Sequence, residues 1–323
     1  MFSSYLFNSK GDSMIQKKYI AVVVLLFAAQ ESTVYGFSMK NLNPFSKKNE
    51  EKIVHKEFPL EKDGKLCIQN LNGSIEVKAA WNQKNVMVNA IIRTQTPEDT
   101  QSINIVANDA VKNNVQIKTT CENDALKKYN VDYIVIVPHH VALNLTTDNG
   151  NIVVNDFQGK IQATTNKGNI TINNAHDLVI ANTQLAGAIN VNHAYGHVKA
   201  ITTKGNIKIS DAHNSIIAHS QKGNIDLQSK TVPSTAKIAL TADNGSISLD
   251  LPTGVNADVQ AHAQKGRVMC QHFITLKPQT LQLTNSTWRE MSSHVEGTLG
   301  SAEATVNLVA SSHIKINETS IRA

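Results

Sequence analysis

The stretch Ala163-Thr-Thr-Asn-Lys-Gly168-Asn-Ile-Thr-Ile172 contains the unit that decides the fold. Counted from its glycine, the residues at −5 and −3 are small, and those at +2 and +4 are aliphatic. This alternation with a period of two predicts a β-strand on each side of a turn, with the apolar side chains facing inward. Glycine at the turn is expected where the backbone adopts a positive φ.

The same unit recurs at a nearly constant spacing. Its glycines follow one another after 18, 19, 18, 18, 22 and 21 residues, at Gly150, Gly168, Gly187, Gly205, Gly223, Gly245 and Gly266. A weaker half-repeat at Gly159, Gly196 and Asn214 gives each unit a second strand. Because so short a unit cannot bury its apolar side alone, we predict an all-β chain. Its core is expected to be a parallel β-solenoid of about 18–22-residue rungs, stacked about 4.8 Å apart.

Residues 1–36 have the order of features of a signal peptide. Lys17-Lys18 precede the apolar run Tyr19–Ala29, and the small residue Gly36 marks the expected cleavage site, with Met14 as an alternative start. An apolar run of this length is too short to span a bilayer. We therefore expect an exported protein in the periplasm, on the cell surface or outside the cell, with no stable membrane span after cleavage.

The rest of the chain divides around the glycine repeats. We expect a polar linker over 37–51, a β-rich, β-sandwich-like N-terminal cap over 52–144, and the solenoid with irregular closing strands over 145–318. The strands of the cap lack the 18-residue period, which favours antiparallel pairing there. Caps are expected because an open end of a stack of strands is a template for aggregation.

Charge and cysteine content exclude several classes of function. The formal net charge of +5 is modest and no dense basic cluster occurs, which argues against nucleic-acid binding. The three cysteines, Cys67, Cys121 and Cys270, do not have the spacing of metal ligands. A disulfide between Cys67 and Cys121 and three separate thiols are both compatible with the sequence.

Three segments resemble a known family: Asn70–Val77, Val131–Pro138 and Gly297–Val306. They are similar to the bacterial putative-adhesin domain family, which comprises exported β-solenoid domains of unknown function. The resemblance covers residues 53–318 and brings no catalytic motif with it. One departure is His313, which stands where the last rung is expected to have glycine.

The sequence offers no catalytic or metal-binding constellation. Asp156 and Asp211 share one column but are expected three rungs, or about 14 Å, apart, which exceeds the 5–9.5 Å of glycosidase carboxylates. His176 and His213 share a column with Tyr195 between them, and about 9.6 Å is too far for a shared zinc ion. We therefore predict no enzyme activity, no metal and no cofactor.

Two regular columns flank the glycines. Asparagines follow the glycine directly at Asn151, Asn169, Asn206 and Asn224. Lysines precede it directly at Lys167, Lys204, Lys222 and Lys265. Stacked asparagines are expected to share hydrogen bonds along the stack, which is a structural role. The lysines form either a ligand-binding edge for an anionic glycan or a solvated edge that resists aggregation.

These observations favour a non-catalytic, exported, adhesin-like surface or envelope protein that presents a repetitive binding face. Its expected partner is an anionic glycan or another envelope protein, and repeated weak contacts would supply the affinity. Two alternatives remain. One is a carbohydrate-active enzyme, a lyase or glycosidase, on a β-helix scaffold, and the other is an envelope scaffold protein.

Overall fold

The computed structural model describes residues 50–80, 84–122, 128–277 and 292–319. The predicted signal peptide and almost all of the predicted linker lie outside these residues. The described residues belong to one compact unit, Lys48–Ala323, built from strands and the short helix α2 (Pro97–Gln101). Within the described ranges, no helix has the length and apolar character needed to cross a membrane.

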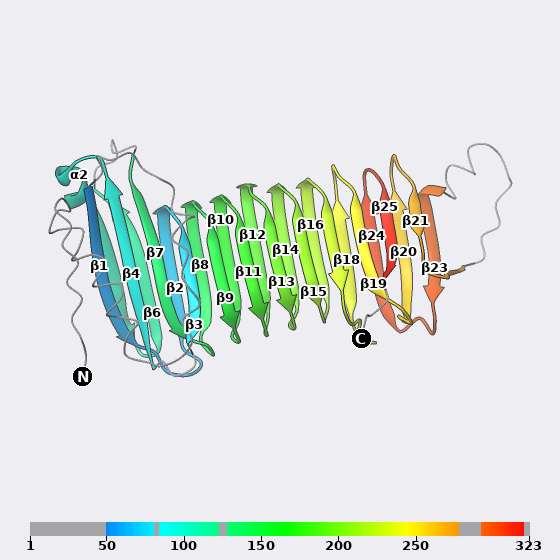
Figure 1. Cartoon of the computed structure of the whole chain (residues 1–323), viewed down its shortest axis with the longest axis horizontal. Coiled ribbons are helices and arrows are strands. Elements are labelled where there is room, and N and C mark those ends of the chain that lie inside the picture. The colour runs from blue at the N-terminus through cyan, green and yellow to red at the C-terminus, as the bar shows by residue number, and fades with distance from the viewer. Residues whose placement is uncertain (1–49, 81–83, 123–127, 278–291, 320–323) are drawn as a thin grey trace, which may run out of the picture. The chain divides into compact units, whose positions relative to one another are not determined.

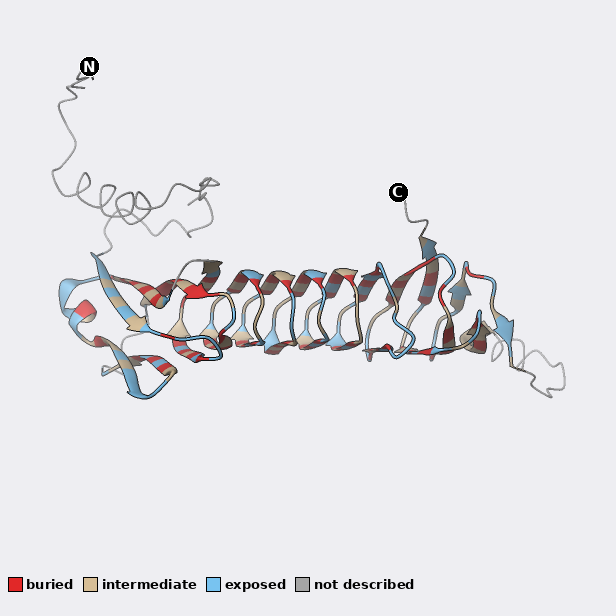
Figure 2. Ribbon diagram, turned by 90° about the horizontal axis from the view of Figure 1, so that it is seen from below, coloured by how far each residue is buried: buried red, intermediate tan, exposed pale blue. Residues whose placement is uncertain are grey.

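The strands form two sheets that lie face to face (Figures 1 and 2). The first sheet has the order β1 (Glu50–Pro59), β4 (Asn85–Thr94), β7 (Asn130–Pro138), β3 (Ile75–Ala80), β9 (Ile152–Phe157), β11 (Ile170–Ala175), β13 (Ile189–Ala194), β15 (Ile207–Ala212), β17 (Ile225–Ser229), β19 (Ile247–Pro252), β25 (Ile314–Thr319) and β21 (Val268–Cys270). The second has the order β22 (Thr275–Leu276), β23 (His294–Leu299), β20 (Ala257–Ala263), β24 (Ala304–Ala310), β18 (Lys237–Ala242), β16 (Ile216–Lys222), β14 (Val198–Lys204), β12 (Val179–Ala186), β10 (Ile161–Lys167), β8 (Ala142–Asn149), β2 (Lys65–Asn72), β6 (Asn114–Cys121) and β5 (Ile103–Val111).

The central strands repeat one unit, here called a rung. In each rung a strand of the second sheet leads through a glycine turn into a strand of the first sheet (Figure 1). Neighbouring rungs pair in parallel and in register, so that Ile170 lies opposite Ile152 on one side and Ile189 on the other. The prediction of an all-β chain with parallel strands is confirmed.

The core is a narrow aliphatic layer between the sheets. Side chains alternate along each strand, so that Ile170 and Ile172 are buried while Thr171 between them is partly exposed, as the red and tan bands of Figure 2 show. Only 5% of the residues are aromatic, and Tyr133 and Phe157 are the largest of the fully buried side chains that the structure describes. Ile, Val, Leu and Ala therefore supply most of the apolar burial.

The strands nearest the N-terminus differ from the antiparallel prediction. β2 pairs in parallel with β6 and β8, and β3 pairs in parallel with β7 and β9. Antiparallel pairing is found between β1 and β4, between β4 and β7, and between β5 and β6. The reason lies in Gly73, which Ile75 and Val77 follow as in the later repeats. β2 and β3 are thus a rung, separated in sequence from the next one by the inserted strands β4–β7.

The rungs near the C-terminus are not stacked in chain order. β24 lies between β18 and β20, and β25 lies between β19 and β21. The last strands of the chain therefore insert between two rungs that are consecutive in sequence (Figure 1). A turn determines how one strand leads into the next, but it does not determine which rung lies beside which. The glycine spacing alone therefore did not reveal the order of the last rungs.

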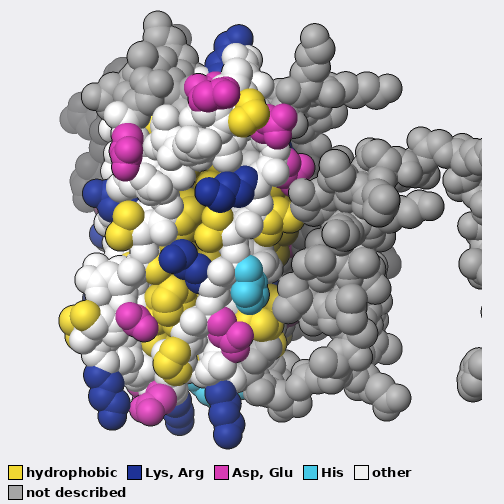
Figure 3. All heavy atoms as spheres, turned by 90° about the vertical axis from the view of Figure 1, so that its left-hand side faces the viewer, with side chains coloured by type: hydrophobic (Ala, Val, Ile, Leu, Met, Phe, Trp, Pro, Cys, Tyr) yellow, Lys and Arg dark blue, Asp and Glu magenta, His cyan; other side chains and the backbone are white. Residues whose placement is uncertain are grey.

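The two sheets do not close on each other. The first sheet ends at β1 and β21, and the second ends at β5 and β22. The structure thus supports long, mostly parallel sheets, and the solenoid remains a prediction. The edge strand β1 is rich in charge, with the sequence Glu50-Glu-Lys-Ile-Val-His-Lys-Glu-Phe-Pro59, which discourages pairing with another chain. Apolar side chains lie in the middle of this end of the unit, with charged ones among and around them (Figure 3).

Candidate functional site

The glycine turns bring successive rungs into unusually close contact. A Cβ atom added to Gly168 would lie 2.0 Å from the carbonyl oxygen of Gly150, and the φ of Gly168 is +145°. Both features require glycine. In the inserted rung the corresponding residue is Ser312, because Ile314 pairs with Ile247 and Val268. The prediction that His313 takes the glycine position is therefore wrong by one residue.

The asparagine column has the structural role that the sequence predicts. Each Oδ1 accepts a hydrogen bond from a backbone N–H of the next rung: Asn151 from Asn169 at 2.8 Å, Asn169 from Ala188 at 2.8 Å, Asn206 from Asn224 at 2.9 Å and Asn224 from Ser246 at 2.9 Å. These bonds hold the turns in register along the stack. The prediction of shared hydrogen bonds along the stack is confirmed.

The four predicted site lysines are exposed on the same edge as these asparagines, and we call them the lysine edge. Lys204 and Lys222 lie directly opposite each other on neighbouring strands. Lys167 lies opposite Ala186, which separates it by one rung from Lys204. Lys265 donates its backbone N–H to Ser311 of the inserted rung. The structure therefore brings Lys204 and Lys222 together. The inserted rung places Lys265 one rung further from Lys222 than the order of the sequence suggests.

The opposite edge is formed by the turns that lead from the first sheet to the second, and histidines gather there. Six of the twelve histidines lie in or beside these turns: His139, His140, His176, His193, His197 and His213. We call this the histidine edge. The sequence shows two of these residues in one column, but it does not show that the edge as a whole is rich in imidazole.

Three rings of the histidine edge form a stack. The ring centroids of His176 and Tyr195 are 4.6 Å apart and those of Tyr195 and His213 are 4.8 Å apart, with interplanar angles of 15° and 14°. Tyr195 remains 44% exposed. The two histidines thus flank the tyrosine as predicted, on rungs too far apart to share a metal ion. The stack presents one polar ring edge per rung to solvent.

A second column on this edge explains its residue types. Asp156, Asn174, His193 and Asp211 all have a positive φ of 52–56°. Asn, Asp and His are the non-glycine residues that adopt this left-handed conformation most readily, so they occupy the corner where each strand ends. Asn174 bonds Asp156 at 3.0 Å, and His193 bonds Asp211 at 2.7 Å. Asp156 and Asp211 lie three rungs apart, with Asn174 and His193 between them, as the sequence predicts.

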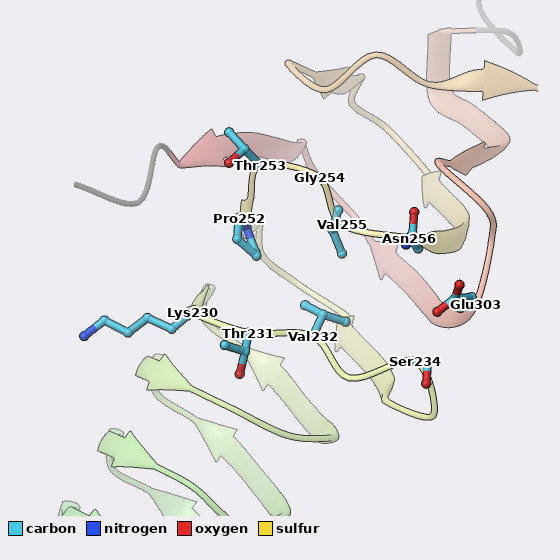
Figure 4. Close-up of a pocket in the computed structure, with 10 residues that line it drawn as sticks. All are labelled: Lys230, Thr231, Val232, Ser234, Pro252, Thr253, Gly254, Val255, Asn256 and Glu303. Carbon is cyan, nitrogen blue, oxygen red and sulfur yellow. The ribbon is translucent and has the colours of Figure 1, made fainter. Parts of the chain in front are cut away.

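The histidine edge leads into a pocket of about 260 Å³ (Figure 4). It lies between the turn after β17 and the turn after β19, which crosses the inserted rung to reach β20. Ten residues line it: Lys230, Thr231, Val232, Ser234, Pro252, Thr253, Gly254, Val255, Asn256 and Glu303. Sequence reasoning missed this pocket because it exists only through the changed order of the rungs.

Hydrogen bonds and ion pairs join the pocket to the ring stack. Thr231 Oγ1 is 3.1 Å from Nδ1 of His213, and Lys230 Nζ is 3.4 Å from Asp211. Partial burial lowers the pKa of His213 below its usual value, and the nearby Lys230 ammonium acts in the same direction. The neutral imidazole, with one donor and one acceptor nitrogen, is thereby favoured.

Carboxylates elsewhere are paired with cations: Glu51 and Asp132 share the Arg93 guanidinium. Asp258 of β20 binds Lys277 at 2.9 Å. On the neighbouring strand β23, Glu296 binds His294 at 3.2 Å. Neither carboxylate lines the pocket of Figure 4, which contains Glu303 as its one acidic residue. Within the residues that the structure describes, no three His, Cys, Asp or Glu side chains form a group suited to a metal ion.

The register separates Cys67 from Cys121, although the sequence left a disulfide between them open. Cys67 lies opposite Gln116 on the neighbouring strand β6, and Cys121 lies five residues further along that strand. At about 3.3 Å per residue this is about 16 Å, far beyond disulfide reach. Burial raises the pKa of the Cys67 thiol, which makes it less reactive.

Comparison with known proteins links the chain to one group of solved structures. No protein-family model and no curated protein matches the chain. A putative cell adhesion protein from Clostridium sporogenes is 9% identical, with a TM-score of 0.27, over 83% of this chain and 100% of that one. A putative adhesin from Bacteroides fragilis is 11% identical, with a TM-score of 0.42, over 83% and 97%.

A putative adhesin from Parabacteroides distasonis is 12% identical, with a TM-score of 0.37, over 82% of this chain and 97% of that one. The three TM-scores are all below 0.5. The fold is therefore described from the strand pairing of this chain and not from these structures. Two of these three structures are named putative adhesins and the third a putative cell adhesion protein, and the sequence of this chain resembles the bacterial putative-adhesin group.

Proposed function

We propose that the protein is an exported, non-catalytic β-solenoid that acts as an adhesin-like surface or envelope protein. One observation supports this most strongly: register pairing holds exposed side chains of the same column one rung apart. Lys204 and Lys222 are direct Cα partners on neighbouring strands, and both are exposed. A ligand with regularly spaced charges would meet matching cations along this edge.

The partner proposed for the lysine edge is an anionic glycan. Exposed ammonium groups attract polyanions over about one Debye length, and each single contact is weak. Binding would therefore depend on several contacts made at once. The asparagine bonds that hold the turns in register fix the lysine backbones before the ligand arrives, which lowers the entropic cost of binding.

The arrangement of carboxylates supports a role without catalysis. Most glycoside hydrolases use two carboxyl groups about 5–9.5 Å apart around the scissile bond. Asp156 and Asp211 are three rungs apart, and Glu303 is the one acidic residue of the pocket in Figure 4. Substrate bound at either place would meet one carboxylate.

The test is binding of the purified protein to immobilised anionic glycans at increasing salt. A variant with Lys167, Lys204, Lys222 and Lys265 changed to Gln is expected to bind at least tenfold more weakly, with a smaller salt dependence. The matched control changes four other exposed lysines, Lys52, Lys62, Lys112 and Lys118, to Gln and removes the same charge. Equal weakening in both variants would show that net charge, and not the lysine edge, is responsible.

The scaffold alternative is favoured by the end of the unit shown in Figure 3. Ile53, Val106 and Val111 of the edge strands β1 and β5 are 39%, 52% and 60% exposed. Exposed apolar side chains are typical of contacts with another protein, and such a contact does not need the strand pairing that the charges of β1 discourage. Recovery of one envelope protein from an extract, together with no glycan binding, would support this alternative.

A further inference from the structure

The pocket in Figure 4 combines an apolar centre with hydrogen-bonding groups at one end. Val232 and Val255 come from the two bordering turns and point toward each other across it, with Pro252 close by. Asn256 and Glu303 lie near each other at one end of the same pocket, and Ser234 lies on the other bordering turn. A few convergent polar groups around an apolar surface are typical of a small-molecule site.

Its polar end is held in place by hydrogen bonds. Asn256 Oδ1 accepts a hydrogen bond from the backbone N–H of Ser301 at 3.1 Å, and the Ser301 hydroxyl is 2.8 Å from Glu303 Oε1. A Cβ atom on Gly300 would lie 2.0 Å from Asn256 Oδ1, so glycine at this position permits the approach. The amide and the carboxylate are therefore positioned before any ligand binds, which reduces the entropic cost of recognition.

Size and charge limit the ligand. A volume of about 260 Å³ is below the roughly 300–1,000 Å³ of sites for drug-sized ligands and suits a single small ring. Glu303 disfavours an anionic ligand, and the Lys230 ammonium is paired with Asp211 on the side of the ring stack. An uncharged ring with hydroxyls at its rim and C–H groups on its faces matches both the apolar centre and the polar end.

The ring stack extends the site along the histidine edge. Thr231 belongs to the pocket and also bonds His213, and Tyr195 and His176 follow at centroid spacings of 4.8 and 4.6 Å. Their faces cover one another, so their polar edges are the groups that solvent and ligands reach. Hydroxyl and imidazole groups at one per rung are suited to hydrogen bonds with consecutive units of a hydroxyl-rich polymer.

We propose that this pocket binds one neutral monosaccharide unit and that the ring stack binds the units that follow it in the same glycan. The site is separate from the lysine edge and takes a ligand of different charge. The result obtained with the lysine variants therefore does not decide whether this site binds a neutral sugar. Multivalent contact along the edge would make an oligosaccharide bind more tightly than its monosaccharide.

The test is titration with glucose, galactose, mannose, N-acetylglucosamine and glucuronate, and with β-linked tetramers of the neutral sugars, followed by ligand-observed NMR. Binding of at least one neutral sugar is expected, with at least tenfold tighter binding of its tetramer. Val232→Phe, which fills the pocket, is expected to abolish binding of both. Tyr195→Ala is expected to weaken the tetramer alone, and Leu185→Ala, an exposed apolar residue outside the histidine edge, serves as its control.

Thermal unfolding by circular dichroism checks that the variants fold. If Val232→Phe does not fold, the nearly isosteric Glu303→Gln replaces it, and at least threefold weaker monosaccharide binding is expected. The proposal is overturned if no neutral sugar binds at millimolar concentration or if glucuronate binds better than the neutral sugars. It is also overturned if the folded pocket variant binds as the unchanged protein does.

Discussion

Three glycine substitutions separate the two reasons why the rungs require glycine. Gly254→Ala places a side chain at φ +75° with no atom within 4 Å, so it measures backbone strain alone, about 1–2 kcal/mol. The φ of Gly150 lies outside the range of +20° to +160°, but the Cβ of Gly150→Ala would lie 1.9 Å from the carbonyl oxygen of Gly73. The forced separation of two rungs is expected to cost about 1–3 kcal/mol.

Gly168→Ala combines both effects, with φ +145° and a Cβ 2.0 Å from the carbonyl oxygen of Gly150. Adding roughly 1–3 kcal/mol of strain to the cost of separating the rungs gives about 2–6 kcal/mol. Urea unfolding followed by circular dichroism measures all three variants. The largest loss is expected for Gly168→Ala. A Gly150→Ala protein within about 0.5 kcal/mol of the unchanged one would refute the close approach of the rungs, because surface substitutions have effects of that size.

Three further predictions concern buried or half-buried groups. Thr165→Val removes the hydroxyl that donates a hydrogen bond to the Gly150 carbonyl at 3.0 Å, and urea unfolding should show a loss of stability of about 1–3 kcal/mol. Thr165→Ser should retain most of the stability, and equal losses in the two variants would contradict this hydrogen bond. Burial raises the pKa of Tyr133 to about 12, above its unfolded value of about 10, so its neutral form is favoured in the fold. The resulting contribution to the free energy of unfolding is fully present below pH 10 and is lost as the pH rises to 12, by about 2–3 kcal/mol. The stability of Tyr133→Phe should lack this dependence on pH, and an unchanged pH profile of the variant would contradict the assignment. Cys67 should react with iodoacetamide at pH 8 more slowly in the folded than in the urea-unfolded protein, because partial burial raises the pKa of its thiol. Peptide mass spectrometry measures both rates, and equal rates would contradict this burial.

The central fold was predictable because one local pattern repeats. Gly168 followed by Ile170 and Ile172 specifies a turn and an inward-facing strand, and its recurrence fixes parallel neighbours. The same reasoning predicted the asparagine bonds, because residues in one column must lie one rung apart. Local sequence did not show that Gly73 belongs to the same stack, since the strands β4–β7 separate it from the next rung.

The pocket was not predictable because it depends on contacts between distant segments. Its lining includes Lys230 and Asn256, whose turns border the inserted strands β24 and β25. Nothing in the sequence around Ala304 says that its strand pairs with β18 rather than extending the end of the sheet. The ring stack was partly visible, since Tyr195 stands between two histidines in one column. Its contact with the pocket through Thr231 required the structure.

The most direct test of the proposed function is to incubate the protein with a bacterial envelope polysaccharide extract and measure two quantities on the same sample. These are the amount of glycan retained by the protein and the number of new reducing ends. Retention of glycan is expected, with reducing ends that stay at the level of a heat-inactivated control. Reducing ends that increase steadily with time and protein concentration would contradict it and show that the protein cleaves the glycan that it binds.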